Sequence, residues 1–332
     1  MNLPPLVRMV LWPLSLVYGQ LMRLRVALYE RGLLKQKRLN RPVISVGNLT
    51  VGGTGKTPMV IWLAERLLAQ GLRVGILSRG YKGSGGTSDE IEVMKLRLNN
   101  RVAFGVGPDR FEQGRRIEAS ADVFLLDDGF QHRQLGRDVD ILLIDAARSL
   151  GKEVMLPTGR LREPVSAMSR ADFLLFTRTE TVPGTIEAIK KLQQYPVFSA
   201  ATQLVGFRRL GERIPFVPAD EIGAGPFYAF CGIGNPRAFF LNLQNWGIAV
   251  AGKCEFGDHH RYDERDVREL VAAARRMGAR ALVTTEKDEQ NLSGEKFEGL
   301  PVYVAVIDLA IDKEEVFLQA IREKLDARNS VA

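Results

Sequence analysis

The residues with the clearest chemical meaning lie around Lys56. The run is Thr50-Val51-Gly52-Gly53-Thr54-Gly55-Lys56-Thr57. It matches the phosphate-binding P-loop, except that Thr50 stands where the first glycine is usual. In such a loop, backbone N–H groups and the start of a helix point at phosphate oxygens. Lys56 would reach the β- and γ-phosphates, and the Thr57 hydroxyl would ligate Mg²⁺. The motif predicts nucleotide binding, with residues 50–57 as the contacts.

An acidic pair, Asp127 and Asp128, follows a hydrophobic run that begins at Val123. Carboxylates at the carboxyl end of a buried strand are what a Walker-B magnesium site needs. Because adjacent side chains point to different sides, one of the two would hold the metal while the other orients a neighbour. Which one does so is left open. The alternative is a strand-end turn with solvated carboxylates, and the P-loop favours the metal site.

The chain contains three histidines, His132, His259 and His260. His132 follows the acidic pair, and the other two form the sequence Asp258-His259-His260. Histidines in polar loops can position or deprotonate a hydroxyl group, or bind a metal. The absence of nearby cysteines makes zinc the weaker interpretation, and a packed or surface role is the plain alternative.

Basic loops supply candidate phosphate contacts. Arg79 ends an expected strand at the sheet edge where α/β proteins bind ligands, and Arg162 lies in Leu161-Arg162-Glu163-Pro164. Arginine binds phosphate through two parallel hydrogen bonds. The alternative for the Arg162 loop is a solvated basic segment. A third segment, residues 284–288 (Thr-Thr-Glu-Lys-Asp), ends another strand, and structural and functional interpretations of it stay equally open.

A strand–loop–helix–strand pattern must hold the P-loop. A strand at 42–46, a helix at about 58–70 and a strand at 73–78 form a βαβ unit, which implies a parallel sheet. Continuous apolar runs predict further buried strands at 123–127, 139–145 and 173–177. A second alternation follows, with strands at 227–231, 248–256, 281–285 and 302–307 and helices at about 236–246, 264–277 and 313–328.

These elements predict an α/β fold: a P-loop NTPase-like parallel-sheet domain, a smaller α/β domain and an N-terminal membrane-interface helix. The 332 residues suit two domains. We expect an arm at 1–41, the P-loop domain at 42–205, the smaller domain at 206–312 and a C-terminal helix at 313–332. Around 200–226 the pattern weakens to short strands. With 45% hydrophobic and 26% charged residues, the composition excludes disordered, collagen-like and polytopic membrane proteins.

The arm carries the chain's entire charge excess. Residues 1–41 hold eight Lys or Arg and one acid, which accounts for the net charge of +7. The arm also has an apolar stretch, residues 9–22, with Trp12 and Tyr18. Roughly 14 residues are too few for the ~20 of a bilayer span. Apolar and basic residues together predict a helix lying on an anionic membrane surface. Packing on its own domain is the alternative, and nucleic acid is not expected.

Together these motifs resemble the tetraacyldisaccharide 4'-kinase family of lipid A biosynthesis. The resemblance covers nearly the whole chain and rests on the motifs in their order. They are the arm, residues 46–58 with the P-loop, Ser78-Arg79-Gly80-Tyr81, Asp127-Asp128-Gly129-Phe130-Gln131-His132, Leu161-Arg162-Glu163-Pro164, Asp258-His259-His260 and Thr284-Thr285-Glu286-Lys287-Asp288.

The resemblance implies a function and a location. The enzyme would transfer the γ-phosphate of ATP, with Mg²⁺, to the 4'-hydroxyl of a tetraacyldisaccharide 1-phosphate, giving lipid IVA. Arg79, His132 and Arg162 would contact substrate or phosphate. The lipid substrate places the protein at the cytoplasmic face of the bacterial inner membrane, bound peripherally through the arm.

The resemblance also implies a catalytic base. In the family an acidic pair follows the Ser-Arg-Gly-Tyr motif, and its Asp pairs with a histidine of the Asp-His-His motif. Here the insert between the two motifs is shortened to residues 82–88, so the base is Asp89. The partner is His259 or His260, and Lys56 completes the catalytic set.

Two other functions compete with this one. A P-loop GTPase-like metallochaperone or switch would show a guanine-selecting Asn/Thr-Lys-x-Asp motif, which Thr285-Glu286-Lys287-Asp288 matches only in part. A membrane-docked nucleotide-binding module would bind ATP and vesicles but make no phosphorylated product.

Overall fold

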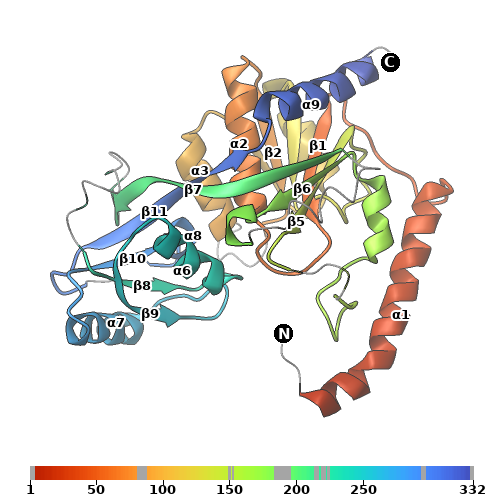
Figure 1. Cartoon of the computed structure of the whole chain (residues 1–332). Helices are drawn as coiled ribbons and strands as arrows, with labels where there is room; N and C mark the ends of the chain where they lie inside the picture. The colour runs from red at the N-terminus through yellow and green to blue at the C-terminus, as the bar shows by residue number, and fades with distance from the viewer. Residues whose placement is uncertain are drawn as a thin grey trace. The chain divides into compact units, whose positions relative to one another are not determined.

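The computed structural model describes residues 4–80, 88–148, 151, 153–182, 196–212, 217, 222, 225–292 and 297–329. The chain divides into two compact units (Figure 1). Unit 1 comprises residues 1–80, 100–201 and 311–332, and unit 2 comprises residues 81–99 and 202–310. Residues 81–99, which include Asp89, therefore belong with the C-terminal half of the chain. Tyr81 and residues 82–87 of the shortened insert at 82–88 lie outside the described residues.

Unit 1 is built on a parallel sheet in the order β3-β2-β4-β1-β5-β6, extended by the first residues of β7. The strands are β1 (Val43–Asn48), β2 (Val74–Ser78), β3 (Ala103–Val106), β4 (Val123–Asp127), β5 (Val139–Asp145), β6 (Phe173–Thr177) and β7 (Val197–Arg209). Every residue of β1, β2, β4, β5 and β6 is buried. This burial explains their continuous apolar sequences, because both faces of the sheet are covered.

The longer helices of unit 1 are α1 (Pro5–Glu30), α2 (Lys56–Ala69), α4 (Arg110–Ile117) and α9 (Glu314–Asn329). Short 3₁₀ turns occur at Glu118–Ser120, Val165–Arg170 and Thr179–Thr181. The C-terminal helix α9 packs into this unit, because Phe317 is fully buried against Trp62 of α2 and against Phe173 and Phe198 of the sheet. Helix α2 follows the P-loop directly and buries seven of its residues, so the end of the loop is held by a well-packed helix.

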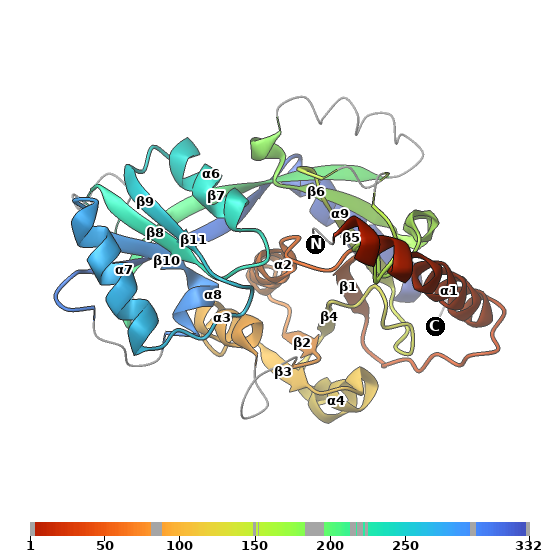
Figure 2. The ribbon, with the colours of Figure 1, turned by 90° about the horizontal axis from the view of Figure 1, so that it is seen from below.

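Unit 2 has its own parallel strands in the order β11-β10-β8-β9. They are β8 (Phe227–Cys231), β9 (Val250–Glu255), β10 (Ala281–Thr285) and β11 (Val302–Ile311). Its helices are α3 (Asp89–Leu98), α6 (Pro236–Asn245), α7 (Glu264–Arg276) and α8 (Glu286–Glu289). Alternate residues of β8 pack on α6 and on α7, which lie on opposite sides of the sheet (Figure 2).

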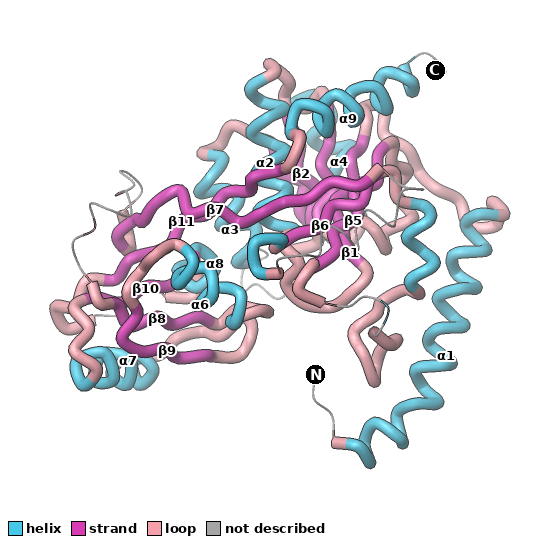
Figure 3. The backbone as a smooth tube through the Cα atoms, viewed as in Figure 1, coloured by secondary structure: helices cyan, strands magenta, loops and turns pink. Residues whose placement is uncertain are grey.

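Helix α1 presents small and polar residues to unit 1 and apolar residues outward. Ser15 and Gly19 are buried, and the Ser15 hydroxyl lies 2.7 Å from that of Thr158. In contrast, Leu6 is 71% and Met9 68% exposed. The helix runs unbroken through Pro13 (Figure 3). Among the described residues, no helix is both long enough and apolar enough to span a membrane.

The structure confirms the α/β class and the large parallel sheet. Strands 123–127, 139–145, 173–177, 227–231 and 281–285 are found with the expected bounds. The expectation of only short strands after residue 200 is wrong, because β7 runs for 13 residues to Arg209. Its residues are a mixture of six half-buried, four buried and three exposed positions, so the sequence shows neither a continuous apolar run nor a clean alternation.

Candidate functional site: a phosphate cluster and an acid–histidine cluster

The P-loop leads from β1 into the first turn of α2. Gly52 and Gly55 have φ of +104° and +86°, a region in which a side chain would be strained. Thr54 is buried, and its hydroxyl accepts a hydrogen bond from Asn48 Nδ2 at 2.8 Å. No side chain of the described residues caps α2 at Gly55. The first N–H groups of the helix therefore stay available for an anion.

Lys56 and two further side chains form the phosphate cluster of unit 1. Lys56 Nζ lies 3.5 Å from Asp128 Oδ1, and Arg162 Nη1 donates to Asp128 Oδ2 at 2.7 Å. Burial alone would raise the pKa of Asp128, but the two cations outweigh it and lower that pKa. Asp128 has φ +48°, a left-handed conformation uncommon outside glycine. We call Lys56, Asp128 and Arg162 the phosphate cluster.

The two acidic residues at the end of β4 point to different partners. Asp127 Oδ2 accepts a hydrogen bond from the Ser78 hydroxyl at 3.0 Å, whereas Asp128 faces Lys56. Asp128 Oδ1 is buried and makes no hydrogen bond to any described residue. A buried carboxylate oxygen whose partner among the described residues is the Lys56 ammonium, at 3.5 Å, suits a hard cation such as Mg²⁺.

His132 lies in the turn after the acidic pair. Burial, together with the charges of Arg110 and Arg137, lowers its pKa to about 4. The imidazole is therefore neutral at pH 7. Arg110 is itself buried, and its charge interacts with Arg79 and with both acids of the β4 end. These interactions bring Arg79, Arg110 and His132 into the electrostatic surroundings of the acidic pair.

A second group of charged residues forms in unit 2 around Asp89, the first residue of α3. His259 Nδ1 lies 2.9 Å from Asp89 Oδ2 and 3.1 Å from Oδ1. Lys287 Nζ lies 3.2 Å from Glu90, 3.2 Å from Asp258 and 3.7 Å from Asp89. We call these five residues the acid–histidine cluster.

The charges of this cluster determine which groups are ionised. Burial opposes ionisation of Asp89, but hydrogen bonds with His259 and Glu90 and the charge of Lys287 lower its pKa below the usual range. Burial and the neighbouring Asp89 raise the pKa of Glu90. The hydrogen bond to Asp89 raises the pKa of His259. The lowered pKa keeps Asp89 ionised and therefore able to accept a proton, and it also makes this carboxylate a weak base.

The two adjacent histidines have different partners. His260 Nε2 lies 2.7 Å from Asp266 in the first turn of α7, and its ring stacks on Phe256. His259 turns toward Asp89 and has φ +62°, held by its backbone N–H to Gly232 O. Sequence reasoning left open which histidine pairs with Asp89, and the structure puts His259 there.

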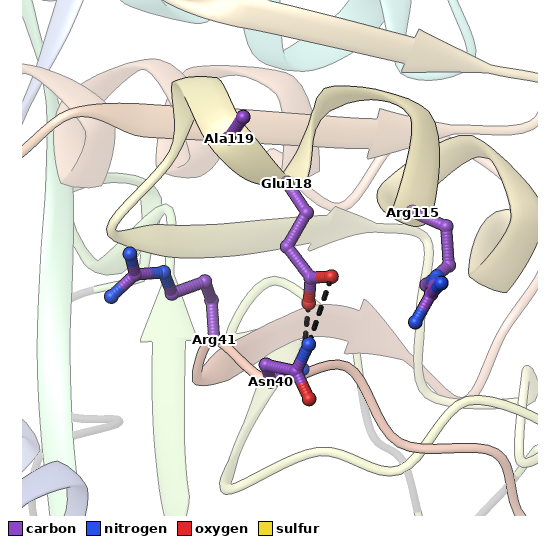
Figure 4. A pocket seen from close by; sticks show the side chains of 5 residues that line it. All are labelled: Asn40, Arg41, Arg115, Glu118 and Ala119. Carbon is purple, nitrogen blue, oxygen red and sulfur yellow. Dashed lines mark hydrogen bonds between the residues drawn. The ribbon is translucent and has the colours of Figure 1, made fainter.

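A pocket of unit 1 lies near the amino ends of strands β1 and β4. It is lined by Asn40, Arg41, Arg115, Glu118 and Ala119. Glu118 points at Asn40 and accepts hydrogen bonds from its backbone and side-chain nitrogens at 2.6 and 3.2 Å (Figure 4). Asn40 precedes β1 and Glu118 precedes β4, whereas the P-loop and Asp127 follow the carboxyl ends of these strands. The pocket therefore lies apart from the phosphate cluster.

Comparison with known proteins identifies the family. The family model for tetraacyldisaccharide-1-P 4'-kinase matches residues 7–326. A tetraacyldisaccharide 4'-kinase of Geobacter metallireducens is 40% identical over 92% of this chain and 95% of its own. One of Pelobacter propionicus is 38% identical over 95% and 92%. The chain belongs to the tetraacyldisaccharide 4'-kinase family.

A solved structure supports this membership. The crystal structure of LpxK from Aquifex aeolicus in complex with ATP superposes with a TM-score of 0.75. It is 33% identical in sequence and covers 96% of this chain and 99% of its own. The resemblance to the tetraacyldisaccharide 4'-kinase family seen in the motifs is thereby confirmed across the chain, including the α/β fold.

Sequence reasoning assigned no role to three charged residues of this family member. Glu90 and Lys287 contact the Asp89–His259 pair, and Arg110 is buried beside the acidic pair. Glu90 could have been found from its position directly after Asp89. Lys287 lies in the segment 284–288, for which the sequence left structural and functional interpretations open. Arg110 gave no signal, because it begins a helix that is charged along its length.

Proposed function

We propose that this protein transfers the γ-phosphate of ATP to the 4'-hydroxyl of a tetraacyldisaccharide 1-phosphate, giving the 4'-phosphorylated lipid A precursor. Family membership supports this reaction. The observation that carries the proposal is the Asp89–His259 hydrogen bond in a chain that also has a P-loop with Lys56. A module that only binds nucleotide has no use for a paired carboxylate and imidazole of this kind.

The phosphate cluster would bind the nucleotide. The N–H groups of residues 52–57 would cradle the phosphates, and Lys56 would exchange part of its contact with Asp128 for the β- and γ-phosphate oxygens. Thr57 with Asp127 or Asp128 would hold Mg²⁺, which supplies positive charge to the transferred phosphoryl group. Arg162, Arg79 and His132 would contact phosphate or substrate.

Asp89 would accept the proton of the sugar hydroxyl. The O–H bond of the 4'-hydroxyl breaks as its oxygen bonds to the γ-phosphorus, and the bond from that phosphorus to the β–γ bridging oxygen breaks to release ADP. The proton passes to Asp89, whose carboxylate is oriented by its hydrogen bond with His259. Most of the rate in phosphoryl transfer comes from positioning and electrostatics, and the proton acceptor contributes part of it.

The arm would hold the enzyme at its lipid substrate. Helix α1 directs apolar side chains outward, among them Leu6, Met9 and Val10, and has basic residues near both of its ends. Such a helix lies in a membrane interface and is attracted by anionic headgroups. We therefore place the protein on the cytoplasmic face of the inner membrane, where both ATP and an acylated disaccharide are accessible.

The test is a phosphotransfer assay. The full-length protein is incubated with γ-labelled ATP, Mg²⁺ and a tetraacyldisaccharide 1-phosphate in detergent micelles, and label is sought in the lipid. Labelled bisphosphorylated lipid is expected. Competition by unlabelled ATP and not by GTP separates this reaction from a guanine-nucleotide switch.

A negative result is also informative. ATP binding without any labelled lipid would overturn the proposed function and favour a nucleotide-binding module. If unlabelled GTP competes with the labelled ATP more strongly than unlabelled ATP does, the protein would instead belong to the class of guanine-nucleotide switches.

A further inference from the structure

The ring nitrogens of His259 face two different groups. Nδ1 faces the Asp89 carboxylate at 2.9 Å, and Nε2 faces the Lys287 ammonium at 3.2 Å. An ionised carboxylate only accepts hydrogen bonds, and an ammonium group only donates them. A neutral His259 satisfies both partners in one way: Nδ1–H donates to Asp89, and the lone pair of Nε2 accepts from Lys287. Hydrogen-bond partners of this kind decide a histidine tautomer.

Lys287 is held at this position by its neighbours in α8. Glu286 accepts hydrogen bonds from Arg97 Nη1, in the last turn of α3, at 3.1 and 3.3 Å. Asp288 is buried and accepts from the backbone N–H of Gly232 at 2.6 Å. The carbonyl oxygen of Gly232 in turn accepts the backbone N–H of His259. One side of Lys287 is thus tied to the helix that carries Asp89, and the other to the loop that carries His259.

Acidic groups surround the Lys287 ammonium. Asp89 and Glu90 approach it from α3 and Asp258 from the histidine loop, at 3.2–3.7 Å. Glu90 and Asp258 also lie 3.7 and 3.9 Å from His259 Nε2. Without the ammonium group, these carboxylates would attract a second proton onto His259.

We propose that Lys287 is a positioning residue for the Asp89–His259 pair: it holds the neutral ring in the tautomer with its proton on Nδ1, and it opposes the addition of a second proton at Nε2. The inference deepens the proposed function and rests on it only where turnover is concerned. Protonation of Nε2 would place an N–H group against the ammonium, which disfavours the imidazolium. With His259 neutral, Asp89 is less tightly bound by its partner and accepts the hydroxyl proton more readily.

The tautomer and the titration can be measured without any substrate. The chain has only three histidines, so ring ¹H–¹⁵N correlation spectra of labelled protein are simple, and His259→Gln assigns the signal. We expect neutral His259 to carry its proton on Nδ1. In Lys287→Met the ring should titrate about one pH unit or more higher, because a cation is lost and carboxylates remain.

Two variants control this measurement. Lys287→Arg keeps the charge and a donor, so it should restore most of the wild-type titration. Lys253→Met removes one charge in the same unit from a lysine whose ammonium lies over the Phe240 ring, and should leave His259 unchanged. A neutral His259 protonated on Nε2 in the wild type overturns the proposal, even if Lys287→Met does not fold. So does an unchanged titration in a folded Lys287→Met.

Turnover gives an independent readout. The acid limb of the kcat–pH profile should move upward in Lys287→Met by the same amount as the His259 titration, with KM for ATP unchanged. A lower kcat with an unshifted profile would show a merely structural role. If the wild type makes no phosphorylated lipid, the proposed function fails, while the spectra still decide the role of Lys287.

Discussion

At the P-loop, one carboxylate holds two cationic side chains in place. Asp128 is paired with both Lys56 and Arg162. A carboxylate between two cations keeps both of them near the loop, and the longer 3.5 Å contact to Lys56 is the one more easily exchanged for phosphate. Lys56 is thus positioned for phosphate by the protein itself.

Lys56→Ala tests this view at the residue scale. We expect kcat to fall by about 100-fold or more, because a positive charge at the transferred phosphoryl group is lost. Label transfer to lipid measures the loss, and circular dichroism checks the fold. Lys324→Ala, which breaks an ion pair with Asp172 in the same unit, is the matched control. Nearly normal turnover in a folded Lys56→Ala protein contradicts the role given to this lysine.

Asp89→Asn tests the proton acceptor. The amide keeps nearly the same shape but cannot take up the hydroxyl proton, so kcat should fall by about 100-fold while KM for ATP stays constant. Asp266→Asn makes the same change at the other Asp–His contact of this loop, with His260, and should cost far less. Equal losses in the two variants would remove Asp89 from its special role.

The residues of the site differ in how visible they are in the sequence. The P-loop is visible because its chemistry is contiguous, from Thr50 to Thr57. Lys287 meets Asp89 across 198 positions, and nothing local to either residue announces the contact. The two-sided environment of His259 also depends on tertiary structure, because its partners come from α3 and α8.

Secondary-structure elements were predictable where burial is uniform. Strand β4 reads as an unbroken apolar run from Val123, since both of its faces are covered. Strand β3 has only four residues, three of them half-buried, and α4 is rich in charge, so neither produced a recognisable period. The length of strand β7 was not predicted for the same reason, because its burial is mixed along the strand.

Helix α1 is connected to the phosphate cluster through a loop. The Tyr18 hydroxyl donates to the carbonyl oxygen of Arg162 at 3.0 Å, and Arg162 contacts Asp128. Tyr18→Phe removes one hydrogen bond of about 1 kcal/mol and should lower kcat by about 5-fold through a less ordered Arg162. Steady-state kinetics measure this effect. The control is Tyr228→Phe, which loses a hydroxyl–carbonyl contact in unit 2. Equal kcat values in the two variants would show that the Tyr18 contact of α1 does not affect the phosphate cluster.

On the scale of the whole molecule, the excess positive charge and the candidate site residues lie in different parts of the sequence. All of the net charge of +7 lies in residues 1–41, while the remaining sequence is balanced. The same segment provides exposed apolar side chains on α1. Electrostatic attraction and apolar insertion are therefore concentrated in one helix and the residues after it. Binding to a membrane should then depend on both lipid charge and salt.

Vesicle binding tests this arrangement. We expect the full-length protein to bind vesicles that contain anionic lipid, and binding to weaken as salt screens the charges. Replacing Arg8, Arg23 and Arg31 by Gln should weaken binding by about 100-fold, since each basic residue near an anionic surface contributes about 1 kcal/mol. Co-sedimentation measures the partition. The matched control makes the same three-charge change on α7, at Arg265, Arg268 and Arg276, and should bind as the wild type does. If both triple variants lose affinity equally, the attraction comes from total charge, and the arm is not the membrane-binding element.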